Sequence, residues 1–475
     1  MTLHESLLDA VGDTPLVRLT RIASGVPAPV YAKVEFFNPA GSVKDRAALG
    51  MVLAAEKSGA LAPGGVIVEG TSGNTGMALA MIAAQRGYRS IVVVPDRTSP
   101  EKIKTLKAYG AEVVVTTGAL PREHPEHVRN VAARLAARTP GAWYANQYDN
   151  PANPEAHRTT TGPEIWAATG GRITHFVVGV GTGGTVTGTG GFLKEASGGQ
   201  VRVIGADPLT STYSGGDGSP YYVESIGHYL HPQTAEDEYP ESYDQSVVDR
   251  FERIGDRESI TMVRRLAREE GILAGGSAGT AVAAALRVAA TLTPDDLVVV
   301  LLPDSGRGYL SKYFDDDWLR RFGFLEDLPG TPTVADALGD RPAPLTALPS
   351  TATVADALTA AGALVPVRLP RSGDNATTDV SEVIGAVRPD ALRALVARDP
   401  SASAAPLHDH LLPSPPAVGI GEPVDEAAAR LATGTGTAWV LIDGRVSGTV
   451  THDALRRTTG HVPPARAAGP ASRAT

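Results

Sequence analysis

The most regular feature of the chain is a series of short apolar runs separated by amphipathic stretches. Continuous β-branched runs of this length are typical of strands buried on both faces of a sheet. The stretches between them, such as MALAMIAAQRG and EKIKTLKAYG, have helical spacing and end in glycine, as many helices do. The pattern therefore predicts repeated βαβ units and mostly parallel sheets. The predicted strands are VIVEG (66–70), IVVVP (91–95), EVVVT (112–116), HFVVGV (175–180), VRVIGAD (201–207) and LVVVLLPDS (297–305).

The hydrophobic pattern changes after Phe324. Proline and glycine interrupt EDLPGTPT, and we predict a linker at residues 326–332. Beyond the linker, TVADAL occurs twice, at 333–338 and 353–358, and EVIGAVRPDAL (382–392) is echoed by RVSGTVTHDAL (445–455). These repeats predict two copies of a small α/β unit over residues 333–460. Residues 461–475 are expected to be a disordered tail.

Composition narrows the function classes. A chain of 475 residues is long enough for two or three domains, and its formal net charge of −9 offers no basic field to nucleic acid. The absence of cysteine excludes disulfides, thiolate metal ligands and a cysteine nucleophile. The longest apolar run, LVVVLLP, is too short to cross a bilayer, and no signal-peptide core is present. We expect a soluble cytoplasmic protein without a metal site, acting on small molecules.

Glycine-containing loops carry the first chemical signal. TSGNTG (71–76) and GVGTGGTVTG (179–188) each follow a predicted strand and open a predicted helix, whereas AGGSAGT (274–280) lacks a clear preceding strand. Glycine lets the backbone approach a ligand closely, and the free amides at a helix start bind phosphate or carboxylate. Several such loops in one βαβ chain predict an anion-binding site.

Two ligands fit the second glycine loop. Gly179, Gly181 and Gly184 spell the dinucleotide fingerprint G-x-G-x-x-G, and Asp207 ends the next predicted strand. However, the hydroxyls of flanking threonines suit a terminal monophosphate better than a pyrophosphate held mainly by backbone. The loop therefore favours a monophosphate, with a dinucleotide as the alternative.

The stretch AGSVKDR (40–46) raises the possibility of a reactive amine. Ser42 and Asp45 form an S-x-x-D capping pattern, which places Lys44 in the first turn of a helix. The positive end of a helix lowers the pKa of an amine and favours the neutral form that attacks a carbonyl to make an imine. The ordinary alternative is a solvated surface lysine.

The ordered motifs AGSVKDR, TSGNTG, GVGTGGT, GGSAG and LLPDS resemble those of the fold-type II pyridoxal phosphate enzymes. The stretches NQYDNPANP and SGRGYLSKYFDDDWL are similar to the cysteine synthase and cystathionine β-synthase branch in particular. The resemblance covers nearly all of residues 3–325 and implies a catalytic domain at 1–325 with two mostly parallel α/β subdomains. The repeats at 333–460 resemble the tandem CBS repeats, or Bateman module, that follow many of these synthases.

The resemblance assigns roles to individual residues. Lys44 would hold pyridoxal 5′-phosphate as an imine, Asn74 would bond the ring 3-hydroxyl, and Ser277 would face the pyridine nitrogen. A neutral serine cannot hold that nitrogen firmly protonated, so the ring is a weaker electron sink and loss of a group from the β-carbon is favoured. The implied phosphate ligands are Gly181, Thr182, Gly183, Gly184 and Thr185, and the implied substrate contacts are Thr71, Ser72, Thr75, Gln147 and Tyr148.

The implied activity is that of a lyase that condenses L-serine with L-homocysteine to L-cystathionine, in the transsulfuration route of cysteine biosynthesis. Lys44 would act as the general base that removes the α-proton. A cysteine synthase that uses O-acetylserine or O-phosphoserine with sulfide is an alternative, as is β-replacement with another nucleophile. A catalytically silent sensor of adenosyl ligands is the alternative from another class. The resemblance implies at least a homodimer and no haem.

Some positions depart from the family pattern. In ESIGHYLHP, Ser225 and His228 stand where an EGIG-type loop has glycine and a tyrosine or acidic residue, and Asn146 stands where aspartate is usual. These changes leave the nucleophile open. In the rear repeats, Asp390 and Asp453 are shifted by one residue from the ribose-binding T-x-x-D-L pattern. S-adenosylmethionine or an adenosine nucleotide is therefore one expectation for this module, and a purely structural pair is the other.

Overall fold

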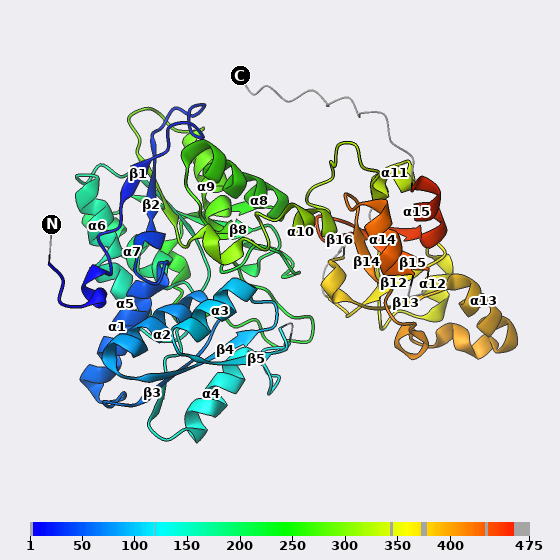
Figure 1. The fold of residues 1–475 in the computed structure, drawn as a ribbon, viewed down its shortest axis with the longest axis horizontal. Coiled ribbons are helices and arrows are strands. Elements are labelled where there is room, and N and C mark those ends of the chain that lie inside the picture. Colours follow the sequence, from blue (N-terminus) through cyan, green and yellow to red (C-terminus); the bar gives the residue numbers. More distant parts are fainter. Residues whose placement is uncertain (1–2, 119, 343–344, 372–377, 433–435, 460–475) are drawn as a thin grey trace. The chain divides into compact units, whose positions relative to one another are not determined.

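The computed structural model describes residues 3–118, 120–342, 345–371, 378–432 and 436–459 (Figure 1). The chain forms two compact units. The first comprises the residues up to Gly218 together with Val223–Phe314, and the second comprises Ser219–Tyr222 together with the residues from Asp315 onward. In the described ranges, no helix is both long enough and apolar enough to span a bilayer.

A four-stranded sheet of the first unit has the strand order β5-β4-β3-β6, and every neighbouring pair is parallel. The runs predicted at 66–70, 91–95 and 112–116 form three of its four strands, because both faces of the sheet are covered by helices; Val68 and Val93 are fully buried. The strands are β3 (Val66–Gly70), β4 (Arg89–Pro95), β5 (Glu112–Thr116) and β6 (Ala142–Tyr144), and the helices between them are α2 (Asn74–Arg86), α3 (Pro100–Ala108) and α4 (Val128–Arg138).

A six-stranded sheet, with the order β1-β2-β10-β7-β8-β9, forms the other half of the first unit. Its pairs are parallel except β1 with β2, so the prediction of mostly parallel sheets is confirmed. The sequence reading did not assign β2 and β9, whose runs VYAKV and RFERI contain charged residues among the apolar ones. The strands are β1 (Leu16–Arg18), β2 (Val30–Val34), β7 (His175–Gly179), β8 (Arg202–Pro208), β9 (Arg250–Ile254) and β10 (Val298–Leu302).

Helices that begin at the carboxyl ends of strands position the chemistry of the first unit. In α/β sheets of this type, ligands bind in the crevice beyond those strand ends. The AGGSAGT loop does not follow a strand. It is held near the carboxyl end of β10 because Ala274 forms an isolated bridge with Ser305, just after that strand. The remaining helices are α1 (Lys44–Ser58), α5 (Ala152–Thr159), α6 (Thr161–Ala168), α7 (Gly184–Ala196), α8 (Asp256–Arg265) and α9 (Gly276–Ala289).

The second unit contains two three-stranded sheets with the same topology, in which the first pair of strands is parallel and the second antiparallel. The strands are β11 (Leu348–Pro349), β12 (Val365–Arg368), β13 (Val383–Val387), β14 (Ala417–Gly419), β15 (Thr437–Ile442) and β16 (Arg445–Thr451). The helices are α10 (Asp316–Arg321), α11 (Val334–Leu338), α12 (Val354–Thr359), α13 (Pro389–Arg398), α14 (Val424–Leu431) and α15 (His452–Thr458).

The sequence repeats of the second unit fold alike. Both TVADAL copies start a helix with a capping box, from Thr333 in one and Thr353 in the other. The main segment of the second unit begins at Asp315, so the predicted linker at 326–332 lies inside that unit. The domain limits 1–325 and 333–460 stay a prediction. The predicted tail at 461–475 lies outside the described residues.

Candidate active site

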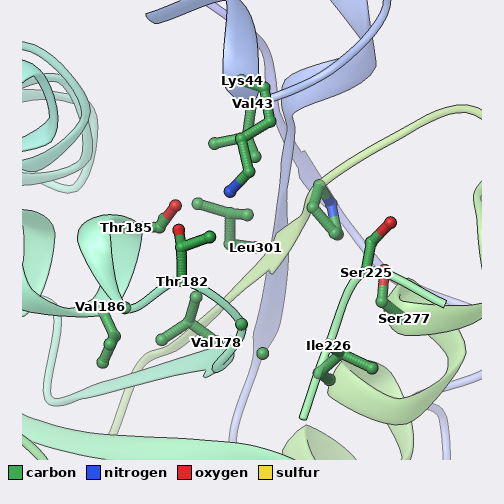
Figure 2. Close-up of a pocket in the computed structure, with 14 residues that line it drawn as sticks. Val43, Lys44, Val178, Thr182, Thr185, Val186, Ser225, Ile226, Ser277 and Leu301 are labelled. Carbon is green, nitrogen blue, oxygen red and sulfur yellow. The ribbon is translucent and has the colours of Figure 1, made fainter. Parts of the chain in front are cut away.

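A pocket lies at the carboxyl ends of β7 and β10. In Figure 2, the Lys44 amine points into the space between two groups of hydroxyls, with Thr182 and Thr185 on one side and Ser225 and Ser277 on the other. The lining residues are Val43, Lys44, Val178, Gly179, Gly181, Thr182, Gly183, Thr185, Val186, Ser225, Ile226, Ser277, Leu301 and Pro303. One cavity therefore gathers the predicted amine, most of the predicted phosphate loop and the predicted ring serine.

Lys44 is the first residue of α1, as its position in AGSVKDR predicts. The predicted S-x-x-D capping pattern is present in part, with Val43 and not Ser42 as the residue before the helix. Ser42 Oγ accepts a hydrogen bond from the Lys44 backbone N (3.2 Å), and Asp45 Oδ2 accepts one from the Ala40 backbone N (2.6 Å). The Asp45 carboxyl also interacts with Ser42, so these two residues together hold the loop that leads into the helix.

The reactivity of Lys44 comes chiefly from burial. Loss of water around its amine lowers the pKa to about 8, although the negative charge of Asp304 acts in the opposite direction. The prediction of a lowered pKa is confirmed, but the cause is different, since desolvation is the largest contribution to the shift. At pH values above 8 most of the amine is neutral and nucleophilic.

The turn between β7 and α7 forms a cradle for an anion. Gly183 has φ +88°, and a Cβ placed on it would lie 2.3 Å from Tyr243 Cβ. A Cβ on Gly184 would lie 2.1 Å from Asn153 Oδ1. Only glycine fits at these two positions, and the turn they form lines the pocket through Gly181, Thr182, Gly183 and Thr185 at the start of α7.

Threonine hydroxyls complete this cradle. Thr182 and Thr185 line the pocket, and Thr185 Oγ1 lies 3.3 Å from His157 Nε2. Burial, together with the nearby charges of Lys44 and Arg46, lowers the pKa of His157 well below its ordinary value. His157 is therefore a neutral support for Thr185, and the cradle would bind an anion through amides and hydroxyls.

Ser277 is the second residue of α9, and its hydroxyl oxygen is buried without a hydrogen-bond partner in the described part of the chain. A buried unpaired hydroxyl costs free energy unless a ligand completes it. Because Ser277 lines the pocket on the side away from the threonines, its hydroxyl is placed to meet a polar atom at the far end of a phosphorylated ligand.

Asn74 starts α2 and is held by a buried hydrogen-bond chain. Its Nδ2 donates to Asp304 Oδ2 (2.7 Å), the same oxygen accepts from the Tyr309 hydroxyl (2.5 Å), and that hydroxyl accepts from Lys102 Nζ (2.7 Å). Desolvation raises the pKa of Asp304. These hydrogen bonds fix the orientation of the Asn74 amide, although Asn74 does not itself line the cavity.

The five predicted substrate contacts lie outside the cavity lining. Thr75 Oγ1 donates to Gln147 Oε1 (2.6 Å), which joins the TSGNTG loop to the segment after β6. The guanidinium of Arg129 lies over the ring of Tyr148, with Arg129 Cζ 4.5 Å from the ring centroid. Ser72 is exposed, and Thr71 Oγ accepts from the Gly73 backbone N (3.2 Å). Their contact with a substrate stays a prediction.

Comparison with known proteins identifies the family. A sequence profile described as "Pyridoxal-phosphate dependent enzyme" matches residues 7–304. The chain belongs to this family. A cystathionine beta-synthase of Apis mellifera is 42% identical over 327 residues, which cover 67% of this chain and 63% of that protein. A probable cysteine synthase of Bacillus subtilis (strain 168) is 47% identical over 306 residues, which cover 64% of this chain and 95% of that protein.

A solved structure is also similar to this chain in both sequence and fold. The crystal structure of an O-ureido-L-serine synthase is 43% identical, with a TM-score of 0.61, and covers 66% of this chain and 96% of its own. The chain spans about 60% of the length of the cystathionine beta-synthases that it matches. The predicted fold class, a fold-type II pyridoxal phosphate enzyme with mostly parallel sheets, is confirmed.

Pyridoxal phosphate is the cofactor of this pyridoxal-phosphate dependent enzyme, and the pocket fits it. The Gly181–Thr185 turn would hold the phosphate, the Lys44 amine is placed for the aldehyde, and the unpaired Ser277 hydroxyl suits the pyridine nitrogen. The sequence reading did not list Val43, Ile226 and the other apolar lining residues as site residues, because no motif distinguishes a pocket wall from a core position.

The lowered pKa predicts how cofactor capture depends on pH. The neutral Lys44 amine forms the imine, and its fraction rises as pH increases toward about 8. We expect the rate of imine formation, after pyridoxal phosphate is added to the cofactor-free enzyme, to increase about tenfold per pH unit below 8 and to level off above it. Stopped-flow absorbance measures this rate. A midpoint near 10.5, the ordinary value for lysine, would contradict the assigned environment.

Proposed function

We propose that the enzyme catalyses β-replacement on serine and condenses L-serine with L-homocysteine to L-cystathionine, with release of water. The observation that carries the proposal is the placement of the Lys44 amine between a phosphate cradle and the neutral Ser277 hydroxyl. Identities of 38–42% to cystathionine beta-synthases support this choice of substrates. This activity belongs to the transsulfuration route of cysteine biosynthesis.

Residues in and near the pocket would have different roles in this reaction. Bound pyridoxal phosphate supplies an aldehyde that forms imines with amines and a conjugated ring that accepts electron density from the α-carbon. Lys44 Nζ would then take the α-proton of the substrate, since its pKa of about 8 makes it an effective base near neutral pH. Ser277 Oγ would face the ring nitrogen without adding charge, which would favour loss of the β-hydroxyl. Thr75 and Gln147, joined by their hydrogen bond, would bind the serine carboxylate.

A cysteine synthase is the second candidate function. Its support is the 47% identity to the probable cysteine synthase of Bacillus subtilis, over 95% of that protein. The structural neighbour O-ureido-L-serine synthase also keeps open β-replacement with a nucleophile other than a thiol. Ser225, His228 and Asn146 are the positions where the chain departs from the family pattern, and His228 Nε2 pairs with Asp237 Oδ1 at 2.8 Å.

A substrate panel decides between the candidates. L-Serine, O-acetylserine and O-phosphoserine are each offered homocysteine or sulfide, and products are identified by mass spectrometry. We expect cystathionine from serine and homocysteine, and none with the Lys44→Ala variant. If no homocysteine mixture yields a thioether while a sulfide mixture yields cysteine, the enzyme is a cysteine synthase. If neither nucleophile reacts, the panel extends to other nucleophiles and the first proposal is rejected.

We propose further that residues 333–460 are a pair of CBS repeats that binds S-adenosylmethionine or an adenosine nucleotide. The two sheets of equal topology and the two matched capping boxes support the pair. Asp390 is exposed and pairs with Arg388 (2.7 Å) at the start of α13. We expect calorimetry of the full-length enzyme to detect heat on addition of S-adenosylmethionine, with a change in activity. No heat with S-adenosylmethionine, adenosine, AMP and ATP would indicate a structural pair.

We propose that the enzyme is at least a homodimer, as its family resemblance implies. Light scattering coupled to size-exclusion chromatography measures the mass directly. A mass equal to that of one 49.2 kDa chain at micromolar concentration would contradict this proposal.

A further inference from the structure

Ser225 has a backbone conformation that favours glycine. Its φ is +67°, in the left-handed region, and the other non-glycine residues with positive φ in the described ranges are Asp13, Asn146 and Asp443. Aspartate and asparagine tolerate this region because their short polar side chains bond locally, whereas serine has no such general advantage. A strained residue of this kind persists only where its surroundings hold it, and such residues cluster at functional sites.

The surroundings of Ser225 do hold it. The carboxylate of its neighbour Glu224 pairs with Lys312 Nζ and lies 3.4 Å from Lys102 Nζ, and the Glu224 backbone N donates to the Tyr313 hydroxyl (3.0 Å). On the other side, the Gly227 backbone N donates to the Val180 carbonyl (2.6 Å). Both flanks of Ser225 are therefore fixed to other parts of the first unit.

Ser225 belongs to the wall of the cofactor pocket and has an unused hydroxyl. Its Oγ is inaccessible to solvent and has no hydrogen-bond partner in the described part of the chain, as is true of Ser277 Oγ. Both serines line the cavity that contains Lys44 and the phosphate turn, and the Ser225 carbonyl lies 3.1 Å from where a Cβ on Gly181 would stand. Backbone strain and an unpaired buried hydroxyl thus coincide at one residue of the pocket wall, and each alone costs free energy.

We propose that Ser225 is a further cofactor-binding residue, whose hydroxyl donates a hydrogen bond to bound pyridoxal phosphate. This contact adds to that of Ser277 and uses a side chain that the glycine of an EGIG-type loop lacks. Glu224 is the positioning residue, since its pairing with Lys102 and Lys312 fixes the loop. The contact is independent of which serine derivative or nucleophile the enzyme uses, so it can fail without affecting the proposed reaction.

Equilibrium dialysis of the full-length holoenzyme tests the proposal with a pair of variants. Ser225→Ala removes the hydroxyl and keeps a Cβ, whereas Ser225→Gly removes the hydroxyl and also relieves the backbone strain. We expect the dissociation constant for pyridoxal phosphate to rise about tenfold in both, the loss of one hydrogen bond, and the absorbance maximum of the bound cofactor to shift in both. Ser214→Ala, at a partly buried serine that does not line the pocket, is the matched control and is expected to change neither quantity.

Unphosphorylated pyridoxal as a second probe locates the contact. An equal loss of affinity for pyridoxal and for pyridoxal phosphate places the hydrogen bond on the ring, and a loss confined to pyridoxal phosphate places it on the phosphate. Either result supports the proposal. Dissociation constants within twofold of the parent enzyme with an unshifted spectrum would overturn it, as would an effect in Ser225→Ala that is absent in Ser225→Gly. Ser225→Gly cannot fail through backbone strain, so at least one variant remains informative.

Discussion

Replacement of Lys44 by alanine is expected to reduce β-replacement by about 10⁴-fold or more and to abolish the absorbance of covalently held cofactor. General base catalysis alone contributes about 10²–10⁴-fold, and Lys44 has a second role as the amine that holds and releases the cofactor. Among the residues that the structure describes, no second amine lines the cavity to substitute for it. Steady-state assays with the best pair from the substrate panel and an absorbance spectrum of the purified variant measure the two effects.

Lys57→Ala is the matched control for this experiment. Lys57 lies in the last turn of the same helix, α1, and is exposed, so its loss is expected to change neither the spectrum nor the rate by more than about twofold. A Lys44→Ala protein that keeps the covalent absorbance band, or more than a tenth of the activity, would show that another amine carries the chemistry.

Replacement of Arg46 by methionine is expected to destabilise the first unit by about 3–5 kcal/mol, because it leaves a buried carboxylate without its counter-charge. Arg46 Nε and Nη2 donate to the two oxygens of Glu35 (2.7 and 3.0 Å), and Nη1 donates to Glu164 Oε1 (2.6 Å). The Glu35 side chain is 0% exposed. Thr14 also donates to Glu35 (2.6 Å), but a neutral hydroxyl cannot replace a guanidinium.

Urea unfolding followed by cofactor absorbance measures this change, since that signal reports on the first unit. Arg86→Met provides the control. Arg86 pairs with Glu56 at the surface, with 37% of its own side chain exposed, and surface pairs of this kind contribute about 0–1 kcal/mol. Arg46→Lys is expected to recover only part of the loss, because one ammonium cannot reproduce the two-pronged contact with Glu35. A loss below about 1 kcal/mol in Arg46→Met would contradict the assigned role of the pair.

The parts of the fold with a strong local signal were predictable from sequence. The β-branched runs such as IVVVP and LVVVLLP form strands because nothing but a doubly covered sheet buries both of their faces. All three glycine-containing loops proved to be helix starts, although only two of them follow a strand. They supply residues in or near the pocket, namely Asn74, Thr185 and Ser277. The order of the motifs along the chain predicted pyridoxal phosphate as the cofactor, and the family match confirms this prediction.

Features that depend on tertiary packing were not predictable. The strand β2 lies between β1 and β10 although its run VYAKV carries a lysine, because Lys33 Nζ finds a partner in Glu164 far along the chain. The cause of the lowered Lys44 pKa was missed because desolvation depends on the closed pocket and not on the local helix start. The left-handed backbone of Ser225 was also invisible, since the sequence shows only that a glycine is replaced and not which φ the position requires.

Reduction of the holoenzyme with sodium borohydride, followed by proteolysis and mass spectrometry, is the most direct test of the central claim that Lys44 holds the cofactor. Borohydride converts the carbon–nitrogen double bond into a stable secondary amine, so the attachment point survives digestion. We predict a phosphopyridoxyl group on the peptide that contains Lys44 and on no other peptide. A protein fully supplied with pyridoxal phosphate that carries no modified lysine, or carries it at another residue such as Lys102, would contradict the account.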